Sequence, residues 1–170
     1  VTTGDANTLI GGLAGDAITT GAKNVALGKN SLGANTAGNK AVAIGTDALA
    51  TQNITSDGDS FNVAVGYQAG TAVTTGTNNT LIGGISGGNL TTGASNVAVG
   101  YNSLGTEDVG QHNVAIGRDA LATQNTATAA NIYNTAVGSS AGAEITTGVS
   151  NTLIGGLTGD ALTIGFSNTA

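Results

Sequence analysis

The sequence contains no cysteine, proline, methionine or tryptophan, and only five of its 170 residues are aromatic. Without cysteine the chain can form no disulfide and offers no thiol for catalysis or metal binding. Its single histidine, His112, excludes a histidine-based metal cluster or catalytic triad within one chain. We therefore expect no enzymatic activity, no catalytic residue, no bound metal and no cofactor.

Charge is also scarce. Charged residues make up 8% of the chain, against roughly 25% in a typical soluble domain. The net charge is −6, and the four basic residues are scattered: Lys23, Lys29, Lys40 and Arg118. Since no basic stripe is present to neutralise phosphates, we expect no nucleic-acid partner. No apolar run approaches the roughly 18 residues of a membrane-spanning helix, so we expect no membrane insertion.

What the sequence does contain is a repeat. The pentapeptide Asn-x-[Ala/Leu]-[Val/Ile/Leu]-Gly recurs in register along the whole chain, and a fixed period is the signature of a stacked repeat architecture. It begins a new coil of 17 or 21 residues at positions 7, 24, 41, 62, 79, 96, 113, 134 and 151, with Ala41 replacing the asparagine once. A tenth coil starts at Asn168.

Four coils form a longer period of 72 residues. Residues 7–78 therefore align without a gap on residues 79–150, and both contain DALATQN, at 47–53 and at 119–125. We predict a single repeat domain over 1–170, with partial coils at 1–6 and from 168. Because the chain begins and ends within a coil, and begins with Val1 rather than methionine, we expect it to be a segment of a longer protein.

Successive side chains of a strand point to opposite faces, so positions 2 and 4 of each pentapeptide share one face and position 3 takes the other. We predict that the aliphatic residue at position 4 forms the core: Ile10, Leu27, Ile44, Val65, Ile82, Val99, Ile116, Val137 and Ile154. Position 3 is always apolar too, and a strand that is apolar on both faces is covered on both. We expect an identical chain to cover position 3, which predicts an oligomer.

The remainder of each coil carries one further aliphatic residue, either leucine at position 9 or an aliphatic at position 12 with glycine at position 9. Position 8 is always small. Glycine occupies position 15 of every complete 17-residue coil, which suits a turn that needs a positive φ. The asparagine at position 1 is predicted to cap the turn before the strand and to stack as a ladder: Asn7, Asn24, Asn62, Asn79, Asn96, Asn113, Asn134 and Asn151.

The pentapeptides NVAIG at 113–117, NVAVG at 62–66 and 96–100, and AVAIG at 41–45 resemble the head repeats of trimeric autotransporter adhesins, the YadA-like heads. That resemblance implies an all-β solenoid, a left-handed parallel β-roll with three parallel chains around an axis, and a role in surface attachment. The longer coils, NTLIGGLAGDA at 7–17 and the four-coil period are similar to tail-fibre repeats of marine viruses.

The second resemblance favours a segment of a phage tail fibre or virion appendage that mediates host attachment, and the alternative is a bacterial adhesin head. Either one implies an extracellular location, on a virion or on a bacterial cell surface. The expected partners are two further copies of the chain and a cell-surface receptor, which is a glycan or a protein.

Two other motifs have features of metal sites. GGLAGDAI at 11–18 resembles a calcium-binding nonapeptide, but that motif binds metal only where successive turns of nine residues stack. Residues 56–60, SDGDS, offer oxygen atoms to a hard cation, but a solvated loop is the better interpretation. Pairs of threonines suggest an ice-binding array, which fails because the pairs are missing from four coils.

The four-residue insertions of the two longer coils, near 53–60 and 125–132, are the best candidates for contact with a target, because loops on a rigid scaffold commonly carry binding. We expect both to protrude on the same side. The candidate contact residues are Asn53, Asp57, Asp59, Asn125 and Asn131. Phe61 and Tyr133 close the two insertions and are predicted to anchor them on the solenoid.

Overall fold

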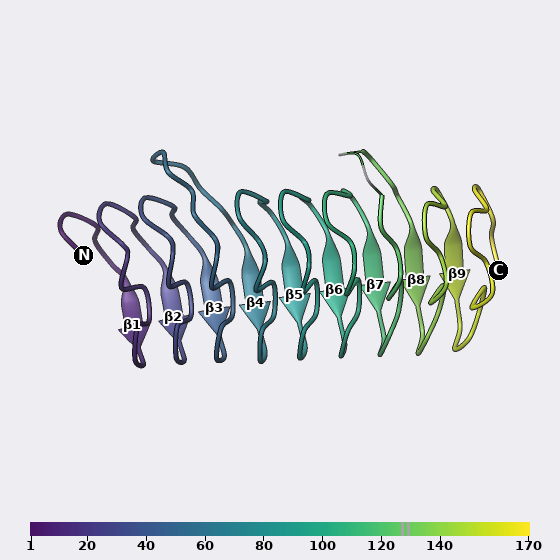
Figure 1. Ribbon diagram of the computed structural model, residues 1–170, viewed down its shortest axis with the longest axis horizontal. Coiled ribbons are helices and arrows are strands. Elements are labelled where there is room, and N and C mark those ends of the chain that lie inside the picture. The colour runs from purple at the N-terminus through teal and green to yellow at the C-terminus, as the bar shows by residue number, and fades with distance from the viewer. Residues whose placement is uncertain (127, 129) are drawn as a thin grey trace.

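The nine pentapeptides form nine short parallel strands in one sheet. The computed structural model describes residues 1–126, 128 and 130–170, and these residues form a parallel β-solenoid in which the strand order follows the chain order (Figure 1). Each strand pairs with the next, with Thr8 opposite Val25 and Val42 opposite Val63. The strands are β1 (Thr8–Ile10), β2 (Val25–Leu27), β3 (Val42–Ile44), β4 (Val63–Val65), β5 (Thr80–Ile82), β6 (Val97–Val99), β7 (Val114–Ile116), β8 (Thr135–Val137) and β9 (Thr152–Ile154).

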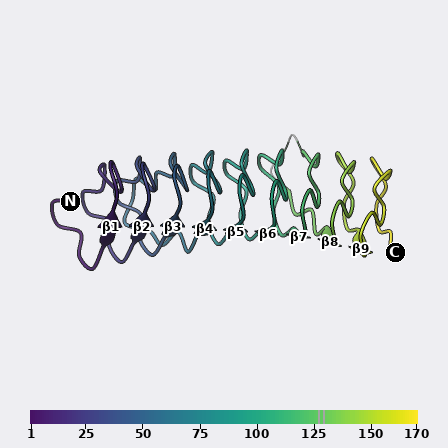
Figure 2. The same cartoon turned by 90° about the horizontal axis from the view of Figure 1, so that it is seen from below.

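Hydrogen bonding between coils continues well beyond these three-residue strands. The Gly28 amide donates to the Ile10 carbonyl at 2.8 Å, and the Gly15 amide donates to the Ser31 carbonyl at 2.9 Å. On the opposite edge, the Lys23 amide donates to the Asp5 carbonyl at 3.0 Å. The backbone polar groups are therefore satisfied largely by the coils on either side, and the coils lie one behind another along the long axis (Figure 2).

The position 3 side chain, not the position 4 side chain, faces the core of the solenoid. Ala26, Ala43 and Leu81 are fully buried, as are the equivalent residues of the other coils from β4 to β8. The expectation that position 3 contacts a neighbouring chain is therefore wrong. A coil of this size encloses one narrow interior, and alanine at position 3 leaves room there for the aliphatic side chain that enters from position 9 or position 12 of the same coil.

The position 4 residues, which we predicted to form the core, lie on the outer face. Ile10 is 57% exposed, Ile82 is 38% exposed and Ile154 is 55% exposed. The prediction failed because both faces of each strand are apolar, so alternation alone does not say which face points inward. The correction applies to Ile10, Leu27, Ile44, Val65, Ile82, Val99, Ile116, Val137 and Ile154, none of which belongs to the buried core cluster.

The interior is filled by residues of complementary size. Where position 9 is leucine, that leucine is fully buried, as at Leu32, Leu49, Leu104 and Leu121. Where position 3 is leucine, position 9 is glycine: a Cβ atom added to Gly87 would lie 2.7 Å from Cδ2 of Leu81. The predicted inward aliphatics at position 12 are also confirmed, since Ile18, Val73, Leu90 and Ile145 are at most 1% exposed.

The glycine at position 15 is required for close stacking and not for a positive φ. None of these glycines is among the residues with positive φ, so that prediction is wrong. A Cβ atom added to Gly21 would lie 2.5 Å from the Gly38 carbonyl oxygen of the next coil, and one added to Gly93 would lie 2.5 Å from the Gly110 carbonyl oxygen. Any side chain at these positions would separate neighbouring coils.

The asparagines at position 1 form a buried ladder that fastens each coil to itself and to the next. The Nδ2 atom of Asn79 donates to the Gly93 carbonyl at 2.9 Å, which ties the start of the coil to its end. The Oδ1 atom of Asn79 accepts from the Asn96 amide at 3.0 Å, which ties one coil to the next. The asparagines from Asn24 to Asn151 are at most 1% exposed. The Ala41 amide donates to Asn24 Oδ1, but Ala41 has no side-chain amide with which to continue the ladder.

Left-handed backbone recurs at fixed coil positions. Among the residues that the structure describes, twenty-three other than glycine have a positive φ, and they occupy positions 7 and 9 and the last position of the coils. Four of them are leucines at position 9, for example Leu32 at 53° and Leu104 at 51°. Bulky residues rarely adopt this conformation, at a cost of about 1–2 kcal/mol each. Here the conformation directs the leucine side chain into the core, and the coils above and below hold it.

The corrected orientation of the strands can be tested at two adjacent residues of β7. We expect Ala115→Asp to abolish the folded state, because an unpaired carboxylate would be buried in a site with no spare volume, at a cost of several kcal/mol. Ile116→Asp should retain the β-sheet circular dichroism spectrum, because Ile116 lies on the outer face and is 37% exposed. Retained structure in Ala115→Asp with loss of structure in Ile116→Asp would restore the original assignment.

Candidate binding surfaces

An apolar strip runs along the outer face of the sheet. It consists of the side chains at positions 2 and 4 of the nine pentapeptides, and we call it the strand strip. In the strands from β3 to β8, the position 3 side chain is buried, whereas the two flanking side chains are half-buried or exposed. Position 2 is valine or threonine, and position 4 is isoleucine, valine or leucine. The strip is therefore continuous, carries no charge and lies on the face that is open in a single chain.

The two insertions extend on the same side of the solenoid. They follow β3 and β7, on the edge opposite to the turns that come directly after the strands (Figure 1). Residues 127 and 129 of the second insertion lie outside the described residues. The two insertions are separated by the four-coil period, so the structure does not bring the candidate contact residues of one beside those of the other.

The first insertion is held against the preceding coil by polar contacts. Asp57 Oδ1 accepts from Asn39 Nδ2 at 2.7 Å, and Asp59 Oδ2 pairs with Lys40 Nζ at 2.6 Å. Both aspartates are exposed. Asn53 is instead committed to the scaffold, because its Oδ1 atom accepts from the Thr36 hydroxyl at 2.9 Å. Asp57 and Asp59 therefore face solvent, whereas Asn53 holds the base of the insertion.

The aromatic residue that closes each insertion rests on the last residue of the coil before it. Lys40 Nζ lies 5.0 Å from the centroid of the Phe61 ring, a cation–π contact. In the second copy, His112 and Tyr133 stack with their ring centroids 5.2 Å apart. Phe61 and Tyr133 remain 50% and 54% exposed, so they anchor the insertions at the surface and not in the core.

The described part of the second insertion carries Asn125 and Asn131, and both are exposed. The Asn125 amide donates to the Thr146 carbonyl at 2.9 Å, and Asn131 forms a parallel bridge with Gln111. Ile132, beside Asn131, is 1% exposed, whereas its counterpart in the first copy is Ser60. The second insertion is thus fixed at its base by an apolar side chain and leaves two amide side chains in solvent.

A buried carboxylate, which the sequence analysis did not identify, positions the start of the second insertion. Glu107 occupies position 12 of its coil and is fully buried. Its Oε1 atom accepts from the Gly110 amide at 2.8 Å and from the Thr126 hydroxyl at 3.1 Å. Its Oε2 atom accepts from Gln124 Nε2 at 2.8 Å. The signal in the sequence was a polar residue at position 12 wherever position 9 is leucine.

Glu107 terminates a chain of side-chain amides that all donate in one direction. Asn134 Nδ2 donates to Gln124 Oε1 at 2.8 Å, and Gln124 in turn donates to Glu107. In the first copy, Asn62 Nδ2 donates to Gln52 Oε1 at 2.8 Å. There the shorter Asn35 stands in place of Glu107, and the buried Nε2 atom of Gln52 has no hydrogen-bond partner. The carboxylate of Glu107 therefore provides the last hydrogen-bond acceptor of this series, and the shorter Asn35 provides none.

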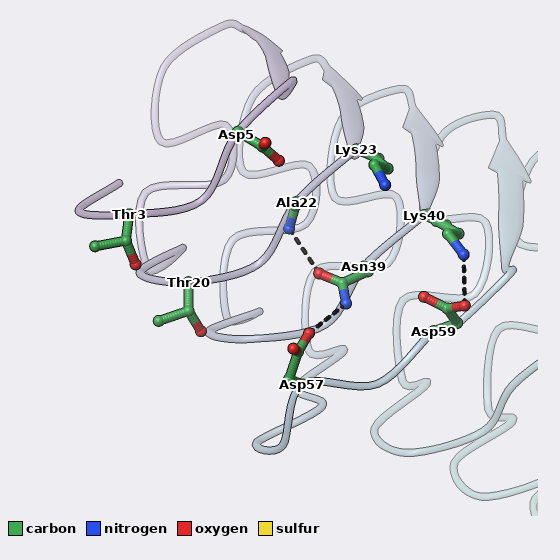
Figure 3. Close-up of a pocket in the computed structure, with 9 residues that line it drawn as sticks. All are labelled: Thr3, Asp5, Thr20, Ala22, Lys23, Asn39, Lys40, Asp57 and Asp59. Carbon is green, nitrogen blue, oxygen red and sulfur yellow. Dashed lines mark hydrogen bonds and ion pairs between the residues drawn. The ribbon is translucent and has the colours of Figure 1, made fainter.

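A polar groove of about 340 Å³ opens beside the first insertion (Figure 3). Eight of its nine lining residues are polar or charged, and five carry a charge: Asp5, Lys23, Lys40, Asp57 and Asp59. Asn39 connects the preceding coil to the first insertion. Its Oδ1 atom accepts from the Ala22 amide at 2.7 Å, and its Nδ2 atom donates to Asp57. The coil ends and the insertion together therefore form one fixed concave surface.

In the part of the chain that the structure describes, no three histidine, aspartate or glutamate side chains gather as a metal ion requires. Asp57 and Asp59 are instead paired with Asn39 and Lys40. Within the same residues, no helix is long and apolar enough to cross a membrane. Comparisons with protein-family models, with curated proteins and with solved structures found no match to this chain.

The role of the buried carboxylate can be measured with Glu107→Gln. The variant introduces a second amide where the Gln124 side chain and four backbone amides all donate, so at least one buried donor loses its acceptor. We expect the free energy of unfolding to fall by about 1–3 kcal/mol, seen as a lower midpoint in thermal unfolding followed by circular dichroism.

The matched control is Glu144→Gln, because Glu144 is the other glutamate of the chain and is exposed. It should change stability by less than about 0.5 kcal/mol. Equal midpoints for the two variants would contradict the structural role of Glu107.

Proposed function

We propose that this chain is a non-enzymatic structural and adhesive segment of a fibre, assembled as a parallel homotrimer, in which the insertions attach a phage tail fibre or related virion appendage to its host cell. The observation that carries this proposal is the strand strip. It carries an aliphatic residue at position 4 of every strand and is half-buried or exposed in a single chain, with Ile10, Leu27 and Ile154 between 42% and 57% exposed. Soluble proteins seldom expose continuous apolar patches of this kind, because such patches drive association.

The geometry of the strip favours a second copy of the same chain as its partner. Nine strands at a spacing of about 4.8 Å make the strip roughly 40 Å long. Its apolar side chains repeat at every strand. A parallel copy has the same spacing and can place one strand against each strand, whereas a globular partner has no such period. Three copies around an axis, as the resemblance to autotransporter heads implies, would cover the strip on each chain.

The insertions supply the attachment surface in this proposal. Residues in the coil walls must fit the coils on both sides, and the insertions escape that constraint. They differ in sequence between the two copies, ITSDGDSF at 54–61 against TATAANIY at 126–133, directly after the shared DALATQN. A constant scaffold with variable loops suits a protein that recognises a changing receptor on a cell surface.

A bacterial adhesin head remains the second candidate function. The observation that favours it is the pentapeptide NVAIG at 113–117 and its close variants, which are the repeats that resemble the autotransporter heads. Both candidates predict the same trimer and the same extracellular attachment. They differ in the structure that carries the segment, which is a virion in one case and the bacterial envelope in the other.

The assembly is tested by light scattering coupled to size exclusion. We expect a mass three times the 16.2 kDa of one chain. The double variant Ile82→Asp and Ile116→Asp should yield monomers, because each chain would place two carboxylates in the apolar contact. Thr92→Asp adds a carboxylate to an exposed site outside the strip and should leave the trimer intact. A monomeric parent protein would refute the assembly.

The attachment role is tested by deleting residues 55–58 and 127–130, which shortens both long coils to 17 residues, the length of the other complete coils. We expect the shortened protein to remain a trimer with unchanged β-sheet content, but to bind cells of a panel of bacterial strains more weakly than the parent. Binding is compared by flow cytometry at equal trimer concentration. Unchanged binding would place the attachment surface outside the insertions.

A further inference from the structure

The groove beside the first insertion concentrates the charge of a chain that has very little. The sequence has 4 basic and 10 acidic residues, fourteen in all, and five of them line this one groove. Two of the four basic residues, Lys23 and Lys40, lie at the same position of consecutive coils and extend on the same side in Figure 3. The groove also includes the hydroxyls of Thr3 and Thr20. Donors and acceptors therefore alternate over a small concave surface.

Part of this charge is used to build the groove, and part of it is free. Lys40 pairs with Asp59, and Asp57 accepts from Asn39. The side chains of Asp5 and Lys23, in contrast, form no hydrogen bond or ion pair with any described residue. Asp57 and Asp59 each keep one carboxylate oxygen outside these contacts. The groove thus presents a fixed frame with one free ammonium group and several free carboxylate oxygens.

The second copy of the four-coil period has a similar backbone at these positions and lacks the charge. Seventy-two residues on, Asp5 is replaced by Thr77, Lys23 by Ser95, Lys40 by His112 and Asp59 by Asn131. Lys23 and Ser95 have nearly the same backbone, with φ of 61° and 59°. The stack therefore does not require charged residues at these sites, and their presence beside the first insertion needs another reason.

We infer that this groove is the saccharide-binding site of the fibre, an inference that rests on the proposed attachment function and names its ligand class. Sugar hydroxyl groups both donate and accept. They can donate to the free oxygens of Asp5, Asp57 and Asp59, and they can accept from the ammonium group of Lys23. The exposed ring of Phe61 is not one of the lining residues, but it lies against Lys40, which is.

The lining argues against the other classes of ligand. Three carboxylates against two ammonium groups repel a phosphate or a nucleic acid. A protein partner needs an apolar centre, whereas Ala22 is the one apolar side chain among the lining residues. The insertion itself forms a wall of the groove through Asp57 and Asp59, so the same site explains how the first insertion contributes to attachment.

The inference is tested with the trimeric protein on an array of printed oligosaccharides that contain neutral hexoses, amino sugars and uronic acids. The informative variant is Asp5→Thr with Lys23→Ser, because it installs the residues that the second copy carries in the same backbone positions. We expect the parent to bind at least one of these saccharides, and the double variant to bind it at least about tenfold more weakly, as loss of one charge-assisted hydrogen bond predicts. Light scattering should give the same mass for both proteins.

The control variant is Lys29→Thr, which removes an exposed lysine on the opposite edge and installs the residue that the next coil has at that position, Thr46. It should bind like the parent. Equal saccharide binding by the parent and the double variant would overturn the inference, and so would a parent that binds cells but no saccharide on the array, a result that points to a protein receptor. If shortening both insertions leaves cell binding unchanged, the proposed attachment function fails instead.

Discussion

The fold depends on one constraint, which is that every coil must lie directly on the next so that their backbones can hydrogen-bond around the whole circumference. Three-residue strands supply only part of this ladder, and the turns supply the rest. Close stacking explains the glycine at position 5 and at position 15 in coils such as that of Gly11 and Gly21, where an added Cβ atom would meet the backbone of the following coil. It also explains the asparagine ladder, in which a single side chain closes one coil and grips the next.

The same constraint limits the interior to a narrow channel with little freedom in size. Each coil fills it with a few aliphatic side chains, and a leucine in one place requires glycine opposite, as for Leu81 and Gly87. Where the aliphatic residue enters from position 9, position 12 becomes a buried polar site. In the second copy, the buried Gln124 side chain has a hydrogen-bond acceptor, because it donates to Glu107. In the first copy, the buried Nε2 atom of Gln52 has no acceptor. A buried unpartnered amide of this kind costs stability, so the two copies differ in their energetics despite a shared backbone.

Sequence reasoning found the solenoid because a strict period survives in every coil. It also located the inward aliphatics at positions 9 and 12, since glycine and leucine alternate there in a complementary way. It chose the wrong face of the strand, because alanine at position 3 and isoleucine at position 4 are both apolar, so alternation alone did not say which of them is buried. In a narrow channel the smaller residue fits inside. The groove could not be foreseen, because Asp5, Lys23 and Asp57 are far apart in the sequence and come together only through the stacking of four coils.

In the proposed fibre, the two faces of the solenoid have different roles. On the strand face every coil repeats the same apolar pair, which suits a contact that must extend without limit along an axis. On the edge that carries the insertions, the two copies share backbone conformation but not chemistry, as Lys40 on Phe61 and His112 on Tyr133 demonstrate. The first insertion is held at the surface by a cation–π contact and the second by stacked rings. Both residues of the contact differ between the two copies, while the backbone of the solenoid is the same. Under the proposed function, recognition can therefore vary one insertion at a time while the stack stays the same.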